Sequence, residues 1–461
     1  MKSMIAMVFC FAALPLVGFA TSPVSVNVKF PSAQREILYS NTEVFKFLGQ
    51  TPSKAQTDAN GYVKLTININ RPNLLIIGTR EANCRLYLLP GETYSIEFTP
   101  SDEKNRVRIT GNNAEGQHLI NNSPPKSYGS APAKQWNLEQ KGNLLQILEN
   151  RIDLALSPYK ALLEEGKINK QFYSIVSLEE GYYQAYTLSQ ALLMNIMNNK
   201  SGKALESDTE QSGSKILESL FQKYPVNHKD LIYSSSFTEY IGNYITFFTS
   251  NNKGYDEAVK RNEGYTYIMA ILKKKLHAAS YRYYAFSFLE ERIHLMEREF
   301  ISLYEHLSKE YPEITINHGR LPAQVDEIKA MYAEAGAISL PSEIRIIENH
   351  EEINGLEELL EKFKGRALFV DLWATWCGPC LGDFESQAPL KEFLIQNEID
   401  LVYVAMEHGN NVDKWKAFLK KYDLSGYHAI ANGKFQQDIK ASKDIGYDGG
   451  RISIPRYLIV N

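Results

Sequence analysis

Residues 367–380 read Ala-Leu-Phe-Val-Asp-Leu-Trp-Ala-Thr-Trp-Cys-Gly-Pro-Cys, and this stretch decides the fold of the C-terminal part of the chain. Its first seven residues form an apolar run with one acid, Asp371, which is typical of a buried parallel strand. A helical pattern follows from the cysteines to about Gln396. A strand, a short loop and a helix make half of a βαβ unit, so we expect an α/β domain here.

The two cysteines, Cys377 and Cys380, carry the chemistry of this stretch. A Cys-X-X-Cys spacing across a helix start puts the sulfur atoms within disulfide reach. Cys377 stands at the expected helix N-terminus, where unpaired N–H groups and the helix dipole favour a thiolate. We expect Cys377 to attack a substrate disulfide and the more buried Cys380 to resolve the mixed disulfide. Pro379 fits the first helical turn without the loss of a backbone hydrogen bond.

The stretch from Val370 to Cys380 resembles the thioredoxin superfamily, and its Trp-Ala-Thr-Trp-Cys phrasing looks most like the exported TlpA/ResA-like branch. The resemblance covers roughly the last quarter of the chain. It implies a thiol–disulfide oxidoreductase that acts on protein disulfides. The redox-active Cys377–Cys380 disulfide would serve in place of a separate cofactor.

The resemblance also implies roles for residues outside the cysteine pair. Asp371 matches the buried acid that accepts the proton of the second cysteine, with a partly solvated strand-end acid as the simpler alternative. Ile454-Pro455 resembles the cis-proline site, which faces the cysteines and pairs with bound substrate; an ordinary trans proline at a strand start is its alternative. The predicted substrate-binding set is Trp376, Gly378, Pro379, Ile454 and Pro455.

Three features depart from thioredoxin proper. Glu385 stands where that family has a helix-kinking proline, and strand 401–406 lacks the lysine that partners the buried acid. A whole thioredoxin fold continues with another strand and a helix, whereas this sequence stops at Asn461. We therefore expect the thioredoxin-like fold to be truncated after the cis-proline strand.

Outward from this stretch, the period of the hydrophobic residues changes along the chain. Residues 24–110 alternate polar and apolar side chains, which predicts an antiparallel β-sandwich with a hairpin turn at Asp58–Gly61. Residues 111–338 carry apolar residues at helical spacing, which predicts an all-α region. Residues 339–461 form the thioredoxin-like domain. The expected fold class is thus multidomain: a β-sandwich, an all-α region and an α/β thioredoxin-like fold.

Two features of the first two domains admit more than one interpretation. Tyrosines cluster in the helical region, as at Tyr182–Tyr186, and suit either an aromatic ligand groove or, more simply, half-buried packing. Cys84 opens a strand, where a lone cysteine is more often a buried apolar residue than a reactive one. A partner- or glycan-binding envelope protein with an auxiliary redox domain is therefore a second class of function.

Residues 1–20 have the pattern of a cleaved signal peptide. Lys2 precedes the apolar run Met4–Phe19, and small residues, Gly18 and Ala20, stand before the expected cut. The run is shorter than the ~20 apolar residues of a spanning helix, which favours cleavage over an N-terminal anchor. We expect export to the periplasm or cell envelope.

The composition of the chain excludes several other classes. A formal net charge of −4 over 461 residues lacks the basic footprint of a nucleic-acid-binding protein. Of the 4 cysteines, Cys10 lies in the signal peptide, so the mature chain is no disulfide scaffold. Zinc needs about four ligands, but a second Cys-X-X-Cys or paired His is missing, and His408 and His428 are near in sequence without ligand spacing. We expect neither nucleic acid nor metal.

The Gly-Pro dipeptide between the cysteines bears on the direction of electron flow. It resembles the dipeptide of reducing family members, whereas oxidants of the DsbA type carry a different one. A reductant in an oxidising compartment needs electrons delivered through the membrane, as DsbD-like proteins deliver them. We therefore expect a reductase with a membrane-bound electron donor of DsbD type, and a disulfide-forming oxidant is the alternative.

Overall fold

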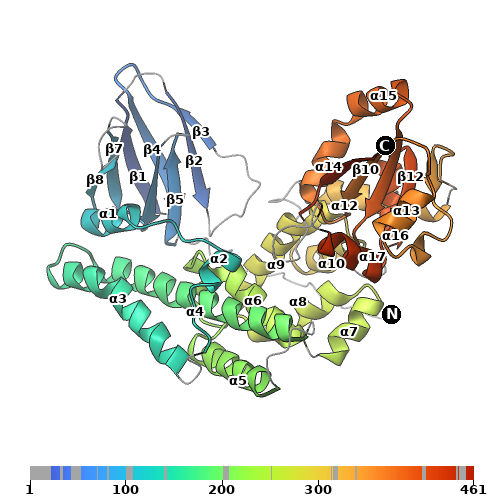
Figure 1. Ribbon diagram of the computed structural model, residues 1–461. Coiled ribbons are helices and arrows are strands. Elements are labelled where there is room, and N and C mark those ends of the chain that lie inside the picture. Colours follow the sequence, from blue (N-terminus) through green and yellow to red (C-terminus); the bar gives the residue numbers. More distant parts are fainter. Residues whose placement is uncertain are drawn as a thin grey trace, which may run out of the picture. The chain divides into compact units, whose positions relative to one another are not determined.

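The structure is a computed structural model, and it describes residues 22–460 except 32–34, 43–52, 70, 80–81, 100–106, 140–142, 201–206, 251, 313, 315–319, 338–339, 408–411, 443–444 and 446–452. The chain divides into two compact units, Met1–Lys253 with Ala270–Tyr284 and Gly254–Met269 with Ala285–Asn461. The predicted signal peptide lies outside the described residues. Figure 1 shows the sheets and helices of both units.

The first unit begins with two four-stranded sheets of order β4-β1-β7-β8 and β3-β2-β5-β6. Neighbouring strands are antiparallel except β1 and β7, which run parallel. Alternate side chains of both sheets, such as Val26, Ile77 and Leu86, share one buried core, so the predicted sandwich is confirmed. The strands are β1 (Ser22–Lys29), β2 (Glu36–Thr42), β3 (Ser53–Gln56), β4 (Tyr62–Ile69), β5 (Asn73–Gly78), β6 (Asn83–Leu88), β7 (Thr93–Phe98) and β8 (Val107–Gly111).

The turn at Asp58–Gly61 is present, but it does not form the predicted hairpin. It joins β3 of one sheet to β4 of the other. Gly61 has a φ of 79°, and the Asp58 carboxylate accepts the backbone N–H of Tyr62 at 2.9 Å. The turn prediction was right and the hairpin pairing was wrong, because turn residues do not encode the sheet that the next strand joins.

Helices cover the outer face of the second sheet. Tyr87, which points out of the sandwich core, packs in a second apolar cluster with Tyr159 of α3 and with Phe172 and Val176 of α4. The side chain of Gln117 in α1 accepts the Tyr87 backbone N–H at 3.0 Å. The helices here are α1 (Ala114–Asn122), α2 (Ser130–Ala133), α3 (Leu144–Glu164), α4 (Lys170–Lys200), α5 (Ser207–Lys223) and α6 (Phe237–Thr249).

Further helices lead to the C-terminal domain and complete the predicted all-α region. In the second unit, α12 packs against α16 (Val412–Lys421), where Lys421 forms an ion pair with Glu327 at 2.6 Å. None of the helices in the described part of the chain is long and apolar enough to cross a membrane. The remaining helices are α7 (Lys253–Lys260), α8 (Gly264–Lys275), α9 (Ala278–Arg292), α10 (Glu299–Glu310) and α12 (Arg320–Ala337).

The C-terminal domain is built on a five-stranded mixed sheet of order β13-β10-β11-β12-β9. Strands β10, β11, β12 and β9 are parallel, and β13 runs antiparallel to β10. This sheet with its flanking helices confirms the predicted α/β class. The strands are β9 (Ile344–Ile346), β10 (Leu368–Trp373), β11 (Asp400–Ala405), β12 (Gly426–Ile430) and β13 (Arg456–Val460).

Helices cover both faces of this sheet. Alternate residues of β10, Val370 and Leu372, share a core with α13 (Leu356–Glu361) and α17 (Gly433–Ala441). On the opposite face, the Trp373 ring contacts Phe384 of α14 (Gly378–Glu385) at a centroid distance of 5.1 Å. The helix predicted to run to Gln396 is interrupted at residues 386–387 and resumes as α15 (Ala388–Gln396). Strand β10 therefore lies between two helical layers, with both edges paired.

The burial of Cys84 predicts that its thiol reacts slowly in the native protein. Its side chain is fully buried in the sandwich core, and burial raises the pKa of the thiol to about 12. We expect iodoacetamide to leave Cys84 unmodified in the reduced native protein and to label it after unfolding, while Cys377 is labelled in both states. Mass spectrometry of tryptic peptides gives the measurement. Rapid labelling of Cys84 in the native state would contradict its assignment to the core.

Candidate functional site

The candidate site lies where β10 ends and α14 begins. Cys377 and Cys380 form a disulfide, with their Cα atoms 5.3 Å apart. Cys377 caps α14, and the backbone N–H of Cys380 donates to the Cys377 sulfur at 3.2 Å. Because N–H groups at a helix start favour negative charge, this geometry stabilises a thiolate on Cys377 once the disulfide is reduced.

The side chains around the disulfide differ in exposure. Cys380 is 1% exposed and Cys377 is 4% exposed, whereas Trp376 is 40% exposed. Gly378 and Pro379 are exposed as well, and the proline stands in the first turn of α14. The surface beside the first cysteine is therefore made by three residues of the predicted substrate-binding set.

Asp371 lies in β10 between two tyrosines. Its direct cross-strand neighbours are Tyr403 on β11 and Tyr457 on β13. The side chain is 5% exposed, and its Oδ1 has no hydrogen-bond partner among the described residues. Burial, and after it the negative charge of Asp383, raises the pKa of Asp371 to about 7. A carboxyl group with a pKa near neutrality can exchange a proton with a neighbouring group at physiological pH.

Two residues of this environment were missed by the sequence reasoning. The Tyr457 hydroxyl donates to Asp383 Oδ2 at 2.6 Å. Asp383 follows Cys380 by three residues, about one turn along α14, and that spacing could have pointed to it. Tyr457 gave no local signal, because only the pairing of β13 with β10 brings it here. Burial and the hydrogen bond to Asp383 raise the pKa of Tyr457, so its hydroxyl stays protonated and donates.

A buried carboxylate, also missed from the sequence, holds the loop before the cysteines. Glu407 is 3% exposed and directly follows β11 and Met406. It accepts the backbone N–H of Thr375 at 2.6 Å and the Thr375 hydroxyl at 3.0 Å. Thr375 stands two residues before Cys377, so these bonds fix the approach of the chain to the disulfide. The sequence feature that could have identified Glu407 is an acid directly after the apolar run 401–406.

The Ile454–Pro455 peptide bond is cis. Leu372 of β10 pairs with Arg456 of β13, so the register carries Pro455 to the end of β10, where the loop to Cys377 begins. Both Ile454 and Pro455 are half-buried. Strand pairing thus brings a segment from the far end of the sequence to the cysteine loop.

His428, one of the two histidines considered for zinc, does not join the site. His428 is fully buried in β12, its Nε2 lies 2.7 Å from the carbonyl oxygen of Leu424, and burial lowers its pKa to about 4. His408 lies outside the described residues. Within the described ranges, no group of three or more His, Cys, Asp or Glu side chains is placed to hold a metal ion.

Comparison with known proteins gives a partial match. No family model matches the chain. A protein called "Thiol-disulfide oxidoreductase ResA" from Bacillus thuringiensis subsp. konkukian (strain 97-27) is 31% identical over 84 residues, which are 18% of this chain and 46% of that protein. The protein of the same name from Bacillus cereus (strain ATCC 10987 / NRS 248) matches to the same extent. The chain thus spans about half the length of these curated relatives, and the match together with the close cysteine pair suggests a thioredoxin-like domain.

The raised pKa of Asp371 predicts a pH dependence of stability. The folded-state pKa of about 7 lies above the ordinary value of 3.8, so the folded state binds this proton more tightly than the unfolded state. The free energy of unfolding should therefore fall as pH rises from about 4 to about 7. The expected loss is about 4 kcal/mol, because a difference of one pKa unit corresponds to ~1.4 kcal/mol. Asp371→Asn should remove this loss, measured by urea unfolding of the oxidised protein.

The exposed Asp326→Asn serves as the control for this measurement, because Asp326 lies on the surface of α12. Its pH profile should run parallel to that of the wild type. Equal pH profiles for the wild type and Asp371→Asn would show that the Asp371 carboxyl is not protonated preferentially in the folded state.

Proposed function

We propose that this chain is an exported thiol–disulfide oxidoreductase that reduces protein disulfides through Cys377 and Cys380. The observation that carries the proposal is the cysteine pair at the start of α14. The backbone N–H of Cys380 donates to the Cys377 sulfur, and the preceding strand contains the buried acid Asp371. The similarity to proteins called ResA supports the same chemistry for the C-terminal domain.

The reaction begins with both cysteines reduced. The Cys377 thiolate attacks one sulfur of a substrate disulfide, a new S–S bond forms between enzyme and substrate, and the second substrate sulfur leaves and takes up a proton. The Cys380 thiol then loses its proton and attacks Cys377 Sγ, which releases the other substrate sulfur as a thiol. The substrate gains two electrons and two protons, and the Cys377–Cys380 disulfide is the oxidised product on the enzyme.

Asp371 supplies the base for the second step in this proposal. Cys380 is almost fully buried, so bulk water has little access to its thiol proton. Asp371 is buried in the strand that leads to the cysteine loop, and its pKa of about 7 matches a group that takes up and gives back a proton near neutral pH. Charge on Asp383 and the Tyr457 hydroxyl bonded to it set the electrostatic surroundings of this base.

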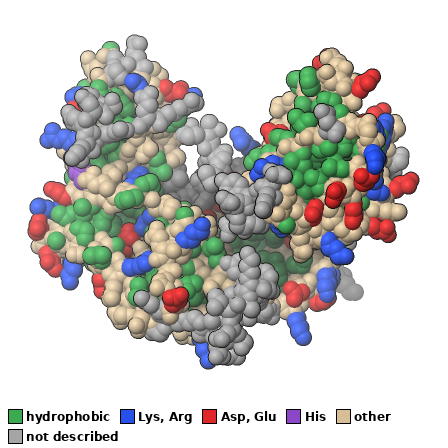
Figure 2. Space-filling view, in the orientation of Figure 1, with side chains coloured by type: hydrophobic (Ala, Val, Ile, Leu, Met, Phe, Trp, Pro, Cys, Tyr) green, Lys and Arg blue, Asp and Glu red, His purple; other side chains and the backbone are tan. Residues whose placement is uncertain are grey.

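In the proposal, the exposed ring of Trp376, next to Cys377 in the chain, offers apolar contact to a polypeptide substrate. Figure 2 shows hydrophobic side chains gathered on the visible face of the C-terminal domain. Among the described residues beyond 340, the exposed large apolar side chains on the domain surface are Trp376, Phe393, Ile395, Tyr457 and Ile459, and Trp376 is the one that adjoins Cys377. In the proposal, Trp376, Gly378 and Pro379 contact the substrate on one side of Cys377, and the Ile454-Pro455 segment pairs with its backbone.

The direction of electron flow and the location follow from the sequence rather than from the site geometry. The Gly-Pro dipeptide resembles that of reducing family members, and the N-terminal pattern resembles a signal peptide. We therefore place the protein in the periplasm or cell envelope, where a membrane-bound donor of DsbD type regenerates the dithiol. A disulfide-forming oxidant with the same cysteine pair is the competing assignment.

A trapping variant tests the chemistry. Cys380→Ala removes the resolving thiol, so the reduced variant should accumulate a mixed disulfide between Cys377 and insulin, a model disulfide substrate. Mass spectrometry under non-reducing conditions measures the adduct, and dithiothreitol should release it. The matched control, Cys377→Ser with Cys380→Ala, should form none, since Cys84 is fully buried. An equal yield of adduct from the control would show that Cys377 is not the nucleophile.

The redox potential of the cysteine pair tests the direction. Thioredoxin lies at about −270 mV and the oxidant DsbA at about −120 mV. We expect the pair to lie near the thioredoxin value, measured by equilibration in thiol/disulfide buffers with tryptophan fluorescence as the readout. A value near that of DsbA would assign the protein as a disulfide-forming oxidant, and the reductase proposal would be withdrawn.

A further inference from the structure

A cavity of about 690 Å³ lies in the first unit, between the outer face of the second sheet and the helices packed on it. Most of its lining comes from β2, β5 and β6, from α1, α3 and α4, and from the segment 123–128, and Gln135 and Ser235 complete it. Ligand pockets in proteins typically measure about 300–1,000 Å³. The cavity is thus large enough for a small molecule, and all of its walls belong to one compact unit.

The sheet provides an apolar wall. Ile76 of β5 pairs with Ser40 of β2 on one side and with Arg85 of β6 on the other, so these three side chains form one cross-strand row. Leu74 and Tyr87 form the next row on the same face. Ile76 is 39% exposed although it stands in an inner strand of its sheet. The most accessible apolar group of the wall therefore faces the cavity rather than a protein core.

Two tyrosine hydroxyls are left for a ligand. Tyr87 and Tyr159 line the cavity and are each 7% exposed, yet neither hydroxyl has a hydrogen-bond partner in the part of the chain that the structure describes. Burial, supported by the nearby carboxylate of Glu180, raises the pKa of both tyrosines, so both hydroxyls keep their protons. Protonated hydroxyls of this kind donate to acceptor oxygens.

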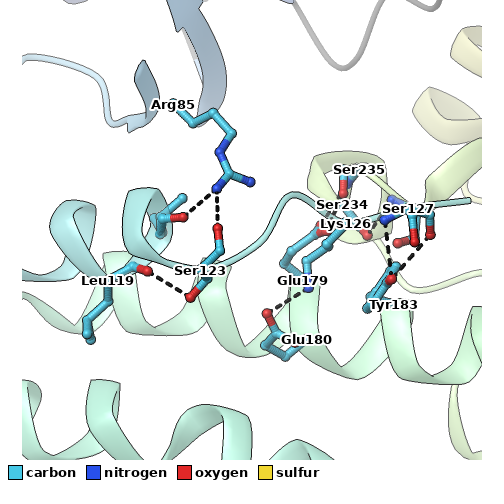
Figure 3. Close-up of polar contacts among 12 residues, drawn as sticks. Arg85, Leu119, Ser123, Lys126, Ser127, Glu179, Glu180, Tyr183, Ser234 and Ser235 are labelled. Carbon is cyan, nitrogen blue, oxygen red and sulfur yellow. Dashed lines mark hydrogen bonds and ion pairs between the residues drawn. The ribbon is translucent and has the colours of Figure 1, made fainter. Parts of the chain in front are cut away.

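The charged groups of the cavity are each hydrogen-bonded or ion-paired to other groups of the protein, as Figure 3 shows. Arg85 donates to the carbonyl oxygens of Ile120 at 2.6 Å and Ser123 at 2.7 Å. Lys126 forms an ion pair with Glu180 at 2.7 Å, and its ammonium lies 4.2 Å from the centroid of the Tyr183 ring.

Among the residues that the structure describes, Ser235 is the hydrogen-bond donor to the Glu179 carboxylate. It accepts the Ser235 backbone N–H at 2.7 Å and also the Ser235 hydroxyl, while the Tyr128 hydroxyl donates to that same hydroxyl at 2.7 Å. The lining contains two basic residues, Arg85 and Lys126, and two acidic ones, Glu179 and Glu180, so its formal charges sum to zero. The lining thus carries no net charge that would select a charged ligand over a neutral one.

We propose that this cavity binds an uncharged, mainly apolar small molecule that carries a hydrogen-bond acceptor such as a carbonyl oxygen. The apolar body would lie against Ile76 and Leu74, and the acceptor would receive the Tyr87 and Tyr159 hydroxyls. A polyhydroxylated sugar fits poorly, because it needs many polar partners and most polar groups here are already bonded to the protein. The proposal goes beyond the redox function and does not depend on it.

Nile red, an uncharged dye with a ring carbonyl, is the probe that tests the proposal. We expect saturable binding with a rise in dye fluorescence and one site per chain. Ile76→Asp should weaken binding by about tenfold or more, because a carboxylate in the apolar wall loses its hydration when the dye binds. The matched control is Ile459→Asp, which changes an isoleucine that is 78% exposed on β13 and should leave the affinity unchanged.

A second variant tests the hydrogen bond and does not rely on a charge in the wall. Tyr159→Phe keeps the ring and removes the hydroxyl, so it should weaken Nile red binding about two- to tenfold. It should leave the binding of pyrene, a hydrocarbon without an acceptor, unchanged. Circular dichroism confirms that each variant is folded, and a Cys377→Ser, Cys380→Ser variant should bind Nile red like the wild type.

The outcomes separate the site from its alternatives. Weaker binding of Nile red by both cavity variants, with pyrene affected only by Ile76→Asp, supports the proposal. No saturable binding, or equal losses for Ile76→Asp and Ile459→Asp, would overturn it. Equal losses of both probes for Tyr159→Phe would also overturn the assigned ligand chemistry, since the hydroxyl would then act only through packing.

Discussion

The burial of a carboxyl group in β10 is the constraint around which the C-terminal domain is organised. Strand β10 is paired on both edges and covered on both faces, so Asp371 is almost fully removed from solvent. An ionised carboxylate in such a place is costly unless it is paired, and Oδ1 of Asp371 lacks a partner among the described residues. The domain keeps this acid at a pKa of about 7, where its proton can be exchanged.

The two units differ in how their buried polar groups are stabilised. In the C-terminal domain the acid is left without compensation, which makes its protonation state responsive to its surroundings. Around the cavity of the first unit, Lys126 and Glu180 neutralise each other, and Arg85 and Glu179 are tied to backbone groups. The first arrangement suits proton transfer, and the second suits a wall that stays neutral and rigid while something apolar occupies the space beside it.

What could be predicted from the sequence depended on how local the signal is. The strand, the loop and the Cys-X-X-Cys pair lie within 367–380, and the chemistry of the pair requires that close spacing, so they were recognised directly. The sandwich, the helical region and the α/β class follow from changes in hydrophobic period. The turn at Asp58–Gly61 was recognised, but its hairpin was not formed, because strand pairing depends on cores assembled from both sheets. Tyr457 was missed because only the pairing of β13 with β10 brings it beside Asp371. Glu407 did have a local signal, an acid directly after an apolar run, but its partner Thr375 lies in a different part of the chain.

The antiparallel strand β13 shows why these non-local contacts matter for the site. Its start follows the cis Ile454–Pro455 bond at the end of β10, and its second residue, Tyr457, donates to Asp383. Asp383 in turn is the charge that acts on Asp371. A single short strand therefore links the segment proposed to contact substrate with the group that tunes the buried acid. Because β13 pairs directly with β10, a shift of β13 along β10 would move Pro455 and Tyr457 together. The register of this strand pair therefore sets both the proposed substrate contact and the charge that raises the pKa of Asp371.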